Sequence, residues 1–483
     1  MDLRIPLICL AVFISLLAPT GLHAQLVKRA PDVYPGTIPE MRTVGYWVAK
    51  MSDPDEVLMT PDKIMRMNDA FRSVMKRPDP LENIPKAEKP LLITWWPGNL
   101  TSSHGIDGMS PAARADSVKS WISAEVDYVR RGRFGNVAGV HYSQRDIERF
   151  IYAMADDSVP GRIVPRTAIA IRHTRLRIVP SVFPHEQGIV DSSLSVSGRS
   201  IGITVNWDLW NNGFVRTGNP VNVLHASRNG EFLFVLSGMK YGWVSAGDIA
   251  FGGRDDIEKF TNPGNFVVCT GDRVPYYSDP ECRTAAGWFA MGDRLPFAGR
   301  SYSRRIQVPM RTDRGGLSTG TAWLPEKADV HVGWLPYTRR NIVVTAFKLL
   351  DTPYDWTGAW FGRDHITTYR DIFRVFGFDL PPHDGLFPLY SGGRYAAVNP
   401  EIGRDAQYRT ILAHEPFVTI MSCGGHAKLL LGSHNAIPVV FDHYGHGYTN
   451  DDGEYVELCR SYVGDMKIPA YFLNRPVAFL ELR

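Results

Sequence analysis

One stretch of the chain joins an aromatic, glycine-rich turn to the start of an amphipathic helix. The turn covers residues 352–364 (TPYDWTGAWFGRD), and His365 follows it where a predicted helix over residues 366–376 begins. The unpaired N–H groups and the dipole of a helix N-terminus stabilise negative charge, so an ionised nucleophile gains most at this position. The residue found there is an imidazole, which has no thiol to ionise. This mismatch is the main chemical feature of the sequence.

Strand-like runs later in the chain lead to further polar residues. Residues 417–421 (FVTIM) pass through a Gly-Gly turn to His426, and residues 438–443 (PVVFDH) end in Asp442 and His443. Two predicted helices followed by a set of antiparallel strands form an α+β order. The sequence therefore predicts one α+β domain over residues 336–483.

The preceding residues change pattern along the chain. Residues 25–160 are predicted to be mainly helical, with helices starting at Pro61 and Pro111, because proline is favoured in the first helical turn. From about residue 167, short alternating runs separated by turn signals predict small β barrels. Residues 242–249, with Gly-Trp-Val followed by Asp-Ile, resemble the end of a bacterial SH3 domain. We assign residues 161–255 to this SH3-like barrel and residues 256–335 to a second, more divergent one.

The first 24 residues have the pattern of a secretory signal. Arg4 gives a positive start, residues 7–17 (LICLAVFISLL) are apolar, and a cleavage site is expected after Ala24. The apolar run is shorter than the roughly 20 residues that a spanning helix needs. We therefore expect an exported mature chain, periplasmic or secreted, with no membrane span.

Chain length, net charge and cysteine content limit the domain organisation and the partners that we expect. A chain of 483 residues is long enough for several domains, and a net charge of +3 is too small to indicate a nucleic-acid partner. Four cysteines remain after the signal (Cys269, Cys282, Cys423 and Cys459). Disulfides are compatible with export; Cys269–Cys282 is the more local pairing and Cys423–Cys459 the next, but spacing decides neither. No cofactor motif is present, since the glycine pairs lack a phosphate-loop context.

The order of elements resembles the NlpC-type cell-wall peptidases, papain-like cysteine enzymes that cut peptidoglycan stem peptides. In that family a Thr-Pro-Tyr-x-Trp-Gly-Gly turn precedes Asp-Cys-Ser at a helix start, and a Gly-His strand follows. The chain also resembles the subgroup with an N-terminal clip region and two bacterial SH3 domains, the γ-D-glutamyl-L-diamino acid endopeptidases. Residues 44–48 (VGYWV) with residues 53–55 (DPD) are similar to the clip region. The resemblance covers nearly the whole mature chain.

The resemblance assigns expected roles to individual residues. Tyr354 and Asp364 match the pair that helps to hold the free amine of an N-terminal L-alanine in the substrate. His426 matches the catalytic base, and the position that orients its ring falls on Asp442, with His443 as the alternative. His365 occupies the position of the nucleophilic cysteine, and thiol attack cannot occur from it.

Three interpretations of the pocket follow. In the first, the domain is catalytically degenerate and binds wall stem peptides or a wall-associated protein. In the second, it is an active hydrolase with an altered nucleophile, for which Cys423 is the nearest candidate to His426. In the third, His365 and His426 join Asp442 or His443 in a metal site. We favour the first interpretation, because both the cysteine and its flanking serine are replaced, by His365 and Ile366.

Overall fold

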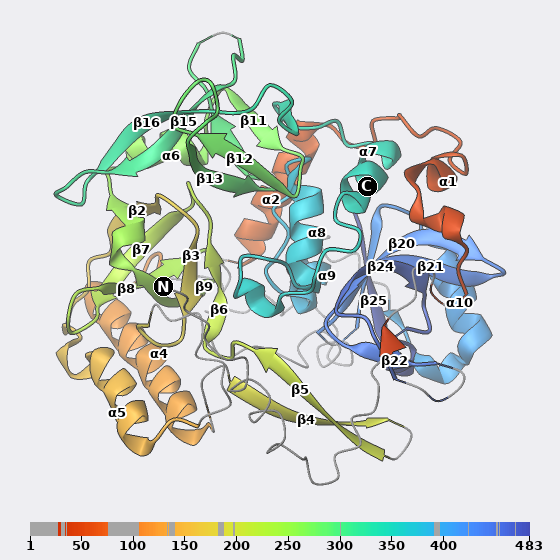
Figure 1. Ribbon diagram of the computed structural model, residues 1–483, viewed down its shortest axis with the longest axis horizontal. Helices are drawn as coiled ribbons and strands as arrows, with labels where there is room; N and C mark the ends of the chain where they lie inside the picture. The colour runs from red at the N-terminus through yellow and green to blue at the C-terminus, as the bar shows by residue number, and fades with distance from the viewer. Residues whose placement is uncertain are drawn as a thin grey trace, which may run out of the picture.

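The computed structural model describes residues 28–29, 34, 36–75, 106–132, 134, 141–181, 188–196, 199–299, 301–390, 397–423, 425–450, 453, 455–468 and 470–483. These residues form two β units and a C-terminal α+β unit, with helices from the N-terminal part packed on them (Figure 1). The predicted multidomain α+β organisation, with N-terminal helices and antiparallel sheets, is confirmed. The predicted signal segment lies outside the described residues.

The first β unit (residues 166–251) is an antiparallel seven-stranded sheet in the order β10-β2-β7-β8-β9-β3-β6. Its strands are β2 (Arg166–Ala170), β3 (Thr174–Arg177), β6 (Asn211–Val215), β7 (Pro220–Ala226), β8 (Phe232–Ser237), β9 (Lys240–Ser245) and β10 (Ile249–Phe251). A hairpin of β4 (Gly188–Val196) and β5 (Arg199–Trp207) is inserted between β3 and β6 and projects from the unit (Figure 1).

The second β unit (residues 266–332) follows helix α6 (Arg254–Thr261). It contains one sheet in the order β14-β11-β17 and another in the order β13-β12-β16-β15. The strands are β11 (Phe266–Cys269), β12 (Arg273–Tyr277), β13 (Ala285–Ala290), β14 (Arg294–Pro296), β15 (Arg305–Arg311), β16 (Leu317–Trp323) and β17 (Val330–Val332).

The C-terminal unit (residues 339–483) packs helices on a six-stranded sheet in the order β18-β25-β19-β20-β21-β24. The helices are α7 (Arg339–Phe347), α8 (His365–Arg374), α9 (Phe387–Tyr390) and α10 (Arg404–Leu412). The strands are β18 (Ala397–Val398), β19 (Thr419–Ser422), β20 (Ala427–His434), β21 (Ile437–Tyr444), β24 (Arg460–Asp465) and β25 (Val477–Glu481). A smaller sheet joins β1 (Lys28–Arg29), β23 (Tyr455–Glu457) and β22 (Gly447–Thr449).

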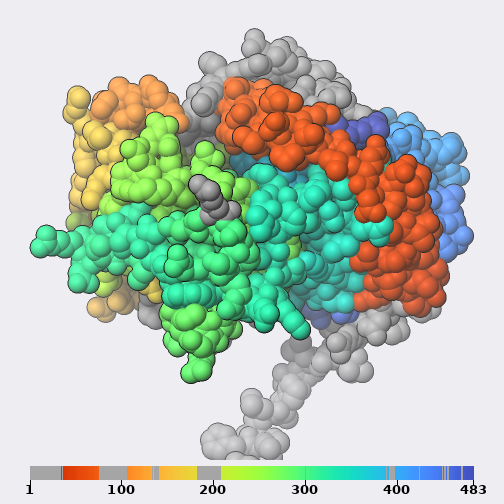
Figure 2. All heavy atoms as spheres, turned by 90° about the horizontal axis from the view of Figure 1, so that it is seen from above, coloured from red at the N-terminus to blue at the C-terminus, as the bar shows by residue number. Residues whose placement is uncertain are grey.

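The N-terminal helices divide between two of these units. Helices α1 (Val44–Val48) and α2 (Pro61–Met75) share a core with the C-terminal unit, over whose helices they lie in Figure 2. Helices α4 (Pro111–Arg131) and α5 (Gln144–Ala153) instead share a core with the first β unit. The predicted helix starts are confirmed, since α2 and α4 each begin at the expected proline.

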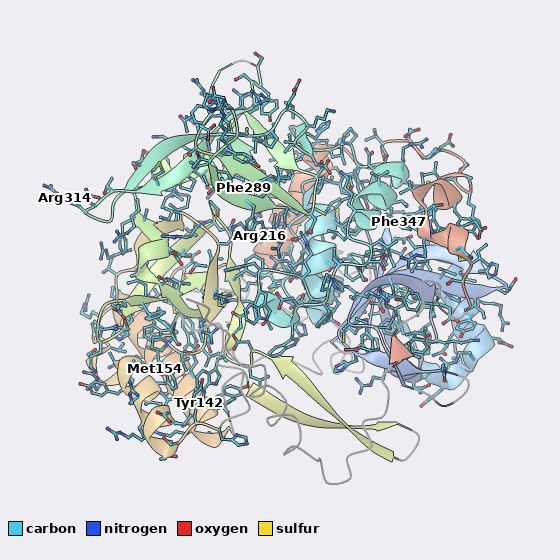
Figure 3. All side chains as sticks on the ribbon, in the orientation of Figure 1. Tyr142, Met154, Arg216, Phe289, Arg314 and Phe347 are labelled. Carbon is cyan, nitrogen blue, oxygen red and sulfur yellow. The ribbon has the colours of Figure 1, made fainter. Side chains whose placement is uncertain are left out.

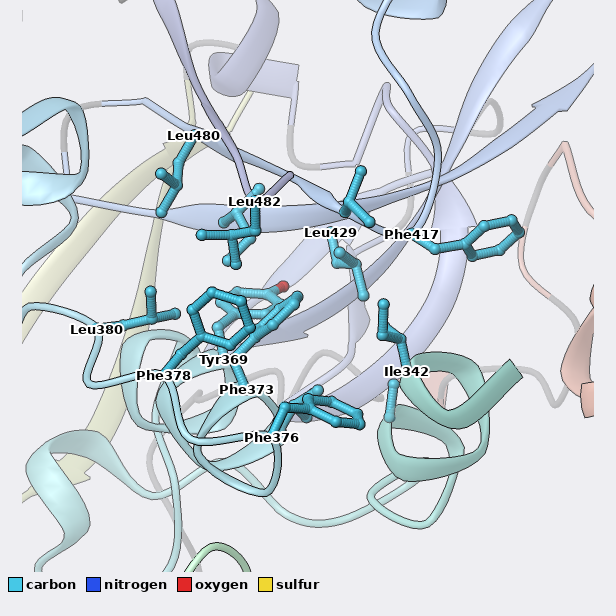
Figure 4. Close-up of a cluster of buried hydrophobic side chains, with 14 of the residues drawn as sticks. Ile342, Tyr369, Phe373, Phe376, Phe378, Leu380, Phe417, Leu429, Leu480 and Leu482 are labelled. Carbon is cyan, nitrogen blue, oxygen red and sulfur yellow. The ribbon is translucent and has the colours of Figure 1, made fainter. Parts of the chain in front are cut away.

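Helix α8 is the central element of the C-terminal unit. It has a strongly amphipathic sequence, and its apolar side chains Tyr369, Ile372 and Phe373 are fully buried. Figure 4 shows Tyr369 and Phe373 packed close to side chains of the sheet, including Leu429. This packing fixes the N-terminus of α8 against strands β20 and β21. Among the described residues, no helix is long and apolar enough to cross a membrane.

Candidate active site

The start of α8 is organised by Asp364. This N-cap residue accepts a hydrogen bond from the N–H of Thr367 at 2.7 Å, and its own carbonyl accepts one from the Thr368 hydroxyl at 2.8 Å. His365 is the first helical residue. The expected position of an imidazole at the helix N-terminus is therefore confirmed.

Strand β20 places a second imidazole against this one. The ring centroids of His365 and His426 are 4.7 Å apart, with the planes tilted by 44°. His426 Nε2 lies 2.8 Å from Asp442 Oδ1 on the adjacent strand β21. Since an ionised carboxylate only accepts hydrogen bonds, Nε2 carries the proton, which leaves Nδ1 as the basic nitrogen of a neutral ring. The structure thus lines up His365, His426 and Asp442.

Asp442 is fully buried and has several further partners. Its Oδ2 accepts from the Lys428 ammonium and, at 2.8 Å, from the Tyr462 hydroxyl, while its own backbone neighbour His443 donates an N–H to Oδ1 at 2.7 Å. Burial acts to raise the pKa of the carboxyl, but His426 and Lys428 outweigh it and hold the pKa well below its usual range. Asp442 is therefore an ionised, fixed acceptor for His426.

His365 is neutral at ordinary pH. Burial and the neighbouring His426 lower its pKa to about 4, despite the opposing effect of Asp364. Its Nδ1 is buried and has no hydrogen-bond partner among the described residues. The site therefore presents an uncharged imidazole where the resemblance calls for a thiolate.

His443 lies apart from His426. Adjacent residues on a strand point to opposite faces, so the side chain of His443 is directed away from that of Asp442. Its Nδ1 lies 2.6 Å from the hydroxyl of Thr368, and its ring meets the edge of Tyr354 at 5.4 Å. Burial, followed by Arg363, lowers its pKa to about 3. Of the two expected orienting residues, the structure brings Asp442 and not His443 to His426.

Tyr354 and Asp364 lie close to this arrangement. The backbone of Tyr354 forms a bridge with Arg363, one residue before Asp364, and its N–H donates to the carbonyl of Cys459 at 2.9 Å. Both side chains are half-buried rather than enclosed. Burial acts to raise the pKa of Asp364, but His365, the N–H of Thr367 and Lys240 together hold it below its usual value. An ionised carboxylate is thus available beside the imidazole of His365.

The cysteines offer no substitute nucleophile in this geometry. Cys423 is buried, its Sγ donates to the carbonyl of Phe472 at 3.3 Å, and burial raises the pKa of its thiol to about 12. Cys269, Cys282, Cys423 and Cys459 are all free thiols, so neither pairing considered from the sequence is formed. Within the described part of the chain, no group of three or more His, Cys, Asp or Glu side chains is arranged to hold a metal ion.

Two supporting residues escaped the sequence interpretation. Lys428 lies near the start of β20, two residues after His426, and a lysine inside the apolar run 427–431 indicates a buried anionic partner. Asp384, from the loop after α8, accepts from the Ser422 hydroxyl at 3.0 Å and from the N–H of Gly425 at 3.1 Å. It thereby holds the turn before His426, a long-range contact with no local sequence signal.

This chain is similar to known proteins in an SH3-type segment and in its fold. A family model described as an SH3 domain (SH3b1 type) matches residues 202–245. The solved structure of an NlpC/P60 endopeptidase from Photobacterium damselae subsp. piscicida is similar over 94% of this chain and 98% of that chain, with 13% identity and a TM-score of 0.68. The chain shares its fold.

Two further solved structures are similar to this chain with lower TM-scores. An NlpC/P60 family protein from Bacillus cereus has 16% identity and a TM-score of 0.39, covering 65% of this chain and 98% of that chain. NlpC2 from Trichomonas vaginalis has 10% identity and a TM-score of 0.20, covering 62% of this chain and 96% of that chain. Among curated proteins, none matches the sequence. The NlpC/P60-like fold therefore rests on the Photobacterium structure.

Proposed function

We propose that this chain is an exported cell-wall protein of the NlpC/P60 type that binds peptidoglycan stem peptides and has lost thiol catalysis. The observation that carries the proposal is His365, which stands at the first residue of α8 and faces His426 at 4.7 Å. The base and its carboxylate partner are thus kept, and the group they would activate is replaced. An unactivated, neutral imidazole does not substitute for a thiolate in peptide-bond cleavage.

The proposed domain organisation follows the same resemblance. Residues 1–24 form the export signal and residues 25–160 the clip-like region. The SH3-type match at residues 202–245 supports a wall-binding role for the barrel assigned to residues 161–255. Residues 256–335 form the second SH3-like barrel, and residues 336–483 the papain-like domain. In this arrangement the barrels position the wall peptide, and Tyr354 with Asp364 contact it.

A hydrolase with another nucleophile is less well supported. The Cys423 thiol is buried with a raised pKa and is directed to the carbonyl of Phe472, so it is neither ionised nor aimed at His426. The hydroxyl of Thr368 is held by the carbonyl of Asp364 and by His443. Neither group has the accessible, activated character that nucleophilic catalysis needs.

The decisive experiment incubates the purified mature protein with L-Ala-γ-D-Glu-diaminopimelate peptides. Calorimetry should detect binding, and chromatography should detect no cleavage. The Asp364→Ala variant should lose binding, whereas the His426→Ala variant should keep it. Turnover that disappears in His426→Ala would overturn the proposal, and so would an absence of any binding.

A further inference from the structure

The turn before α8 carries an exposed tryptophan. The side chain of Trp360 is 45% exposed, so a large aromatic ring forgoes much of the burial that usually stabilises a fold. The backbone beneath it is fixed, because the N–H groups of Trp360 and Gly362 both donate to Asp355 Oδ2, at 2.7 and 2.8 Å. The ring is therefore held at the surface by a closed turn.

Two arginines and two further aromatic rings continue this surface. The guanidinium of Arg175 on β3 lies 5.7 Å from the ring of Trp360 and 4.8 Å from the ring of Phe361. The Phe361 ring is 6.5 Å from that of Trp288 on β13, and the guanidinium of Arg273 on β12 lies 4.6 Å from the Trp288 ring. We call these five residues the aromatic platform. The two β units and the C-terminal unit all contribute to it.

Hydrogen bonds between the units hold both arginines of the platform. Arg175 Nε donates to the carbonyl of Ala359 at 2.5 Å, and Arg273 Nη2 donates to the carbonyl of Phe361 at 3.2 Å. Both acceptors are backbone carbonyls, which carry no net charge. Within the described residues, no carboxylate lies within ion-pair distance of either guanidinium. The two positive charges are thus positioned without being neutralised by a direct partner.

Another arginine beside an exposed aromatic ring differs in this respect. Arg228 lies 4.1 Å from the ring of Tyr152 at the end of α5, but its Nη2 is paired with Asp157 at 2.5 Å. At the platform, Asp272 precedes Arg273 in the sequence and is paired with Arg363 instead. The platform therefore combines an exposed ring with guanidinium groups that can still bind an anion.

These features define the chemistry of a ligand. A flat aromatic ring packs against the apolar face of a sugar or against a base, and a guanidinium forms bidentate hydrogen bonds with a carboxylate or a phosphate. A nucleic acid strand offers a base and a phosphate, but a net charge of +3 is too small for the extended basic surface that its binding requires. An acidic saccharide is the better match.

We propose that the aromatic platform binds a peptide-free glycan strand of the cell wall. In such a strand each N-acetylmuramic acid carries a free lactyl carboxylate, which would pair with Arg175 or Arg273 while a sugar ring packs on Trp360. The inference rests on the proposed function only in taking the wall as the partner. It adds a saccharide site to the proposed peptide site, and the turn before α8 contributes to both.

The test compares three probes by calorimetry at about 0.15 M salt. They are peptide-free glycan strands, chito-oligosaccharides with similar rings and no carboxylate, and a single-stranded oligonucleotide. The wild-type protein should bind the glycan strands roughly tenfold to a hundredfold more tightly than the chito-oligosaccharides, because hydrogen bonds to charged groups are the stronger ones. The oligonucleotide should bind more weakly than the glycan strands.

Variants assign these effects to the platform. Trp360→Ala should weaken the binding of both saccharides at least roughly tenfold, and Trp360→Phe should retain most of the affinity because it keeps a ring. Arg273→Met should reduce the preference for the glycan strands. Tyr152→Ala is the matched control, since it removes an exposed ring beside an arginine that already has a carboxylate partner. Melting curves establish that each variant is folded.

The outcomes separate the two proposals. If the wild-type protein binds the stem peptide but neither saccharide, the platform is overturned and the proposed function stands. If it binds the glycan strands but not the stem peptide, the proposed function fails and the platform stands. Unchanged saccharide binding by Trp360→Ala, a full preference in Arg273→Met, or tighter binding of the oligonucleotide than of the glycan strands would each overturn the platform.

Discussion

At the scale of single residues, the candidate site pairs a histidine with a carboxylate, and an imidazole lies beside them at the start of α8. His426 and its partner Asp442 are hydrogen-bonded at 2.8 Å, and Asp442 is itself held by Lys428 and Tyr462. A buried ionic network of this kind is costly unless every member is satisfied. The network therefore fixes the ring of His426 beside His365, as the proposed function requires of a base without a thiol to activate.

The His365→Cys variant should therefore acquire thiol chemistry. A cysteine at the first residue of α8 gains from the helix dipole, and it would lie beside the basic nitrogen of His426, both of which favour the thiolate. We expect the variant to cleave the γ-D-Glu–diaminopimelate bond, and we expect iodoacetamide to alkylate the new cysteine rapidly. Mass spectrometry of the modified peptide distinguishes this cysteine from the native ones.

The double variant His365→Cys/His426→Ala is the control. General-base assistance contributes roughly 10²- to 10⁴-fold to such reactions, so the gained activity should fall by at least this factor. A His365→Cys protein that folds, binds the peptide and still shows no turnover would mean that the remaining residues no longer form a catalytic arrangement.

At the scale of elements, the turn before α8 is held by hydrogen bonds and by packing that its local sequence pattern does not predict. Asp355 accepts hydrogen bonds from the N–H groups of Trp360 and Gly362 at 2.7 and 2.8 Å, which closes the turn on itself. Gly358 has a φ of 71° and packs on Phe214 of β6. The turn therefore links the first β unit to His365 at the start of α8.

The Gly358→Ala variant should loosen this link. The added methyl group would meet the Phe214 ring at 2.6 Å, and the backbone conformation at φ 71° disfavours any residue with a Cβ. We expect a loss of about 1–3 kcal/mol in the free energy of unfolding, measured by urea denaturation, and weaker peptide binding. Gly264→Ala is the control, since a Cβ there meets no atom within 4 Å. Equal stability of the two variants would contradict a tight contact at Gly358.

Sequence-based prediction succeeded for individual helices and strands and failed for contacts between distant segments. Local signals sufficed for helix starts such as Pro61 and Pro111, because a cap and a proline act within one turn. Alternating runs correctly predicted strands β7, β8 and β9. These local signals could not predict contacts between residues that lie far apart in the sequence. Asn211 donates to Thr357, which lies 146 residues further along the chain, and nothing in either local pattern indicates this contact.

The same limit applies to the site. The juxtaposition of His365, His426 and Asp442 was expected from a family resemblance, not from their spacing, which spans separate elements. To decide whether Asp442 or His443 contacts His426, one must know which face of β21 each side chain occupies. A shift of one residue in the strand register would exchange the two faces. For the cysteines, closeness in sequence did not predict a disulfide. Cys269 and Cys282, the more local of the two pairs, are free thiols in the structure.

At the scale of the whole molecule, one buried arginine joins all three units. Arg216, which follows β6, donates to Asp293 of the second β unit at 3.0 Å and also to Asp371 of α8. Asp371 is paired in addition with Arg363, at 2.7 Å. Figure 3 shows Arg216 near the centre of the molecule, where the β units and α8 meet. Helix α8 is thus held by a charge network that joins the three units, and the proposed ligand binding should depend on this network.

Replacing Arg216 should uncouple the units. Arg216→Met leaves Asp293 buried without its cation, and breaking a buried ion pair on one side costs about 3–5 kcal/mol. Scanning calorimetry should show unfolding that is broader or more divided for Arg216→Met than for the wild-type protein, with peptide binding lost before the C-terminal unit melts. The control Arg254→Met removes an exposed pair with Glu258, which contributes at most about 1 kcal/mol. If Arg216→Met melted as one transition at the wild-type temperature, the units would be held together by their apolar contacts and not by this network.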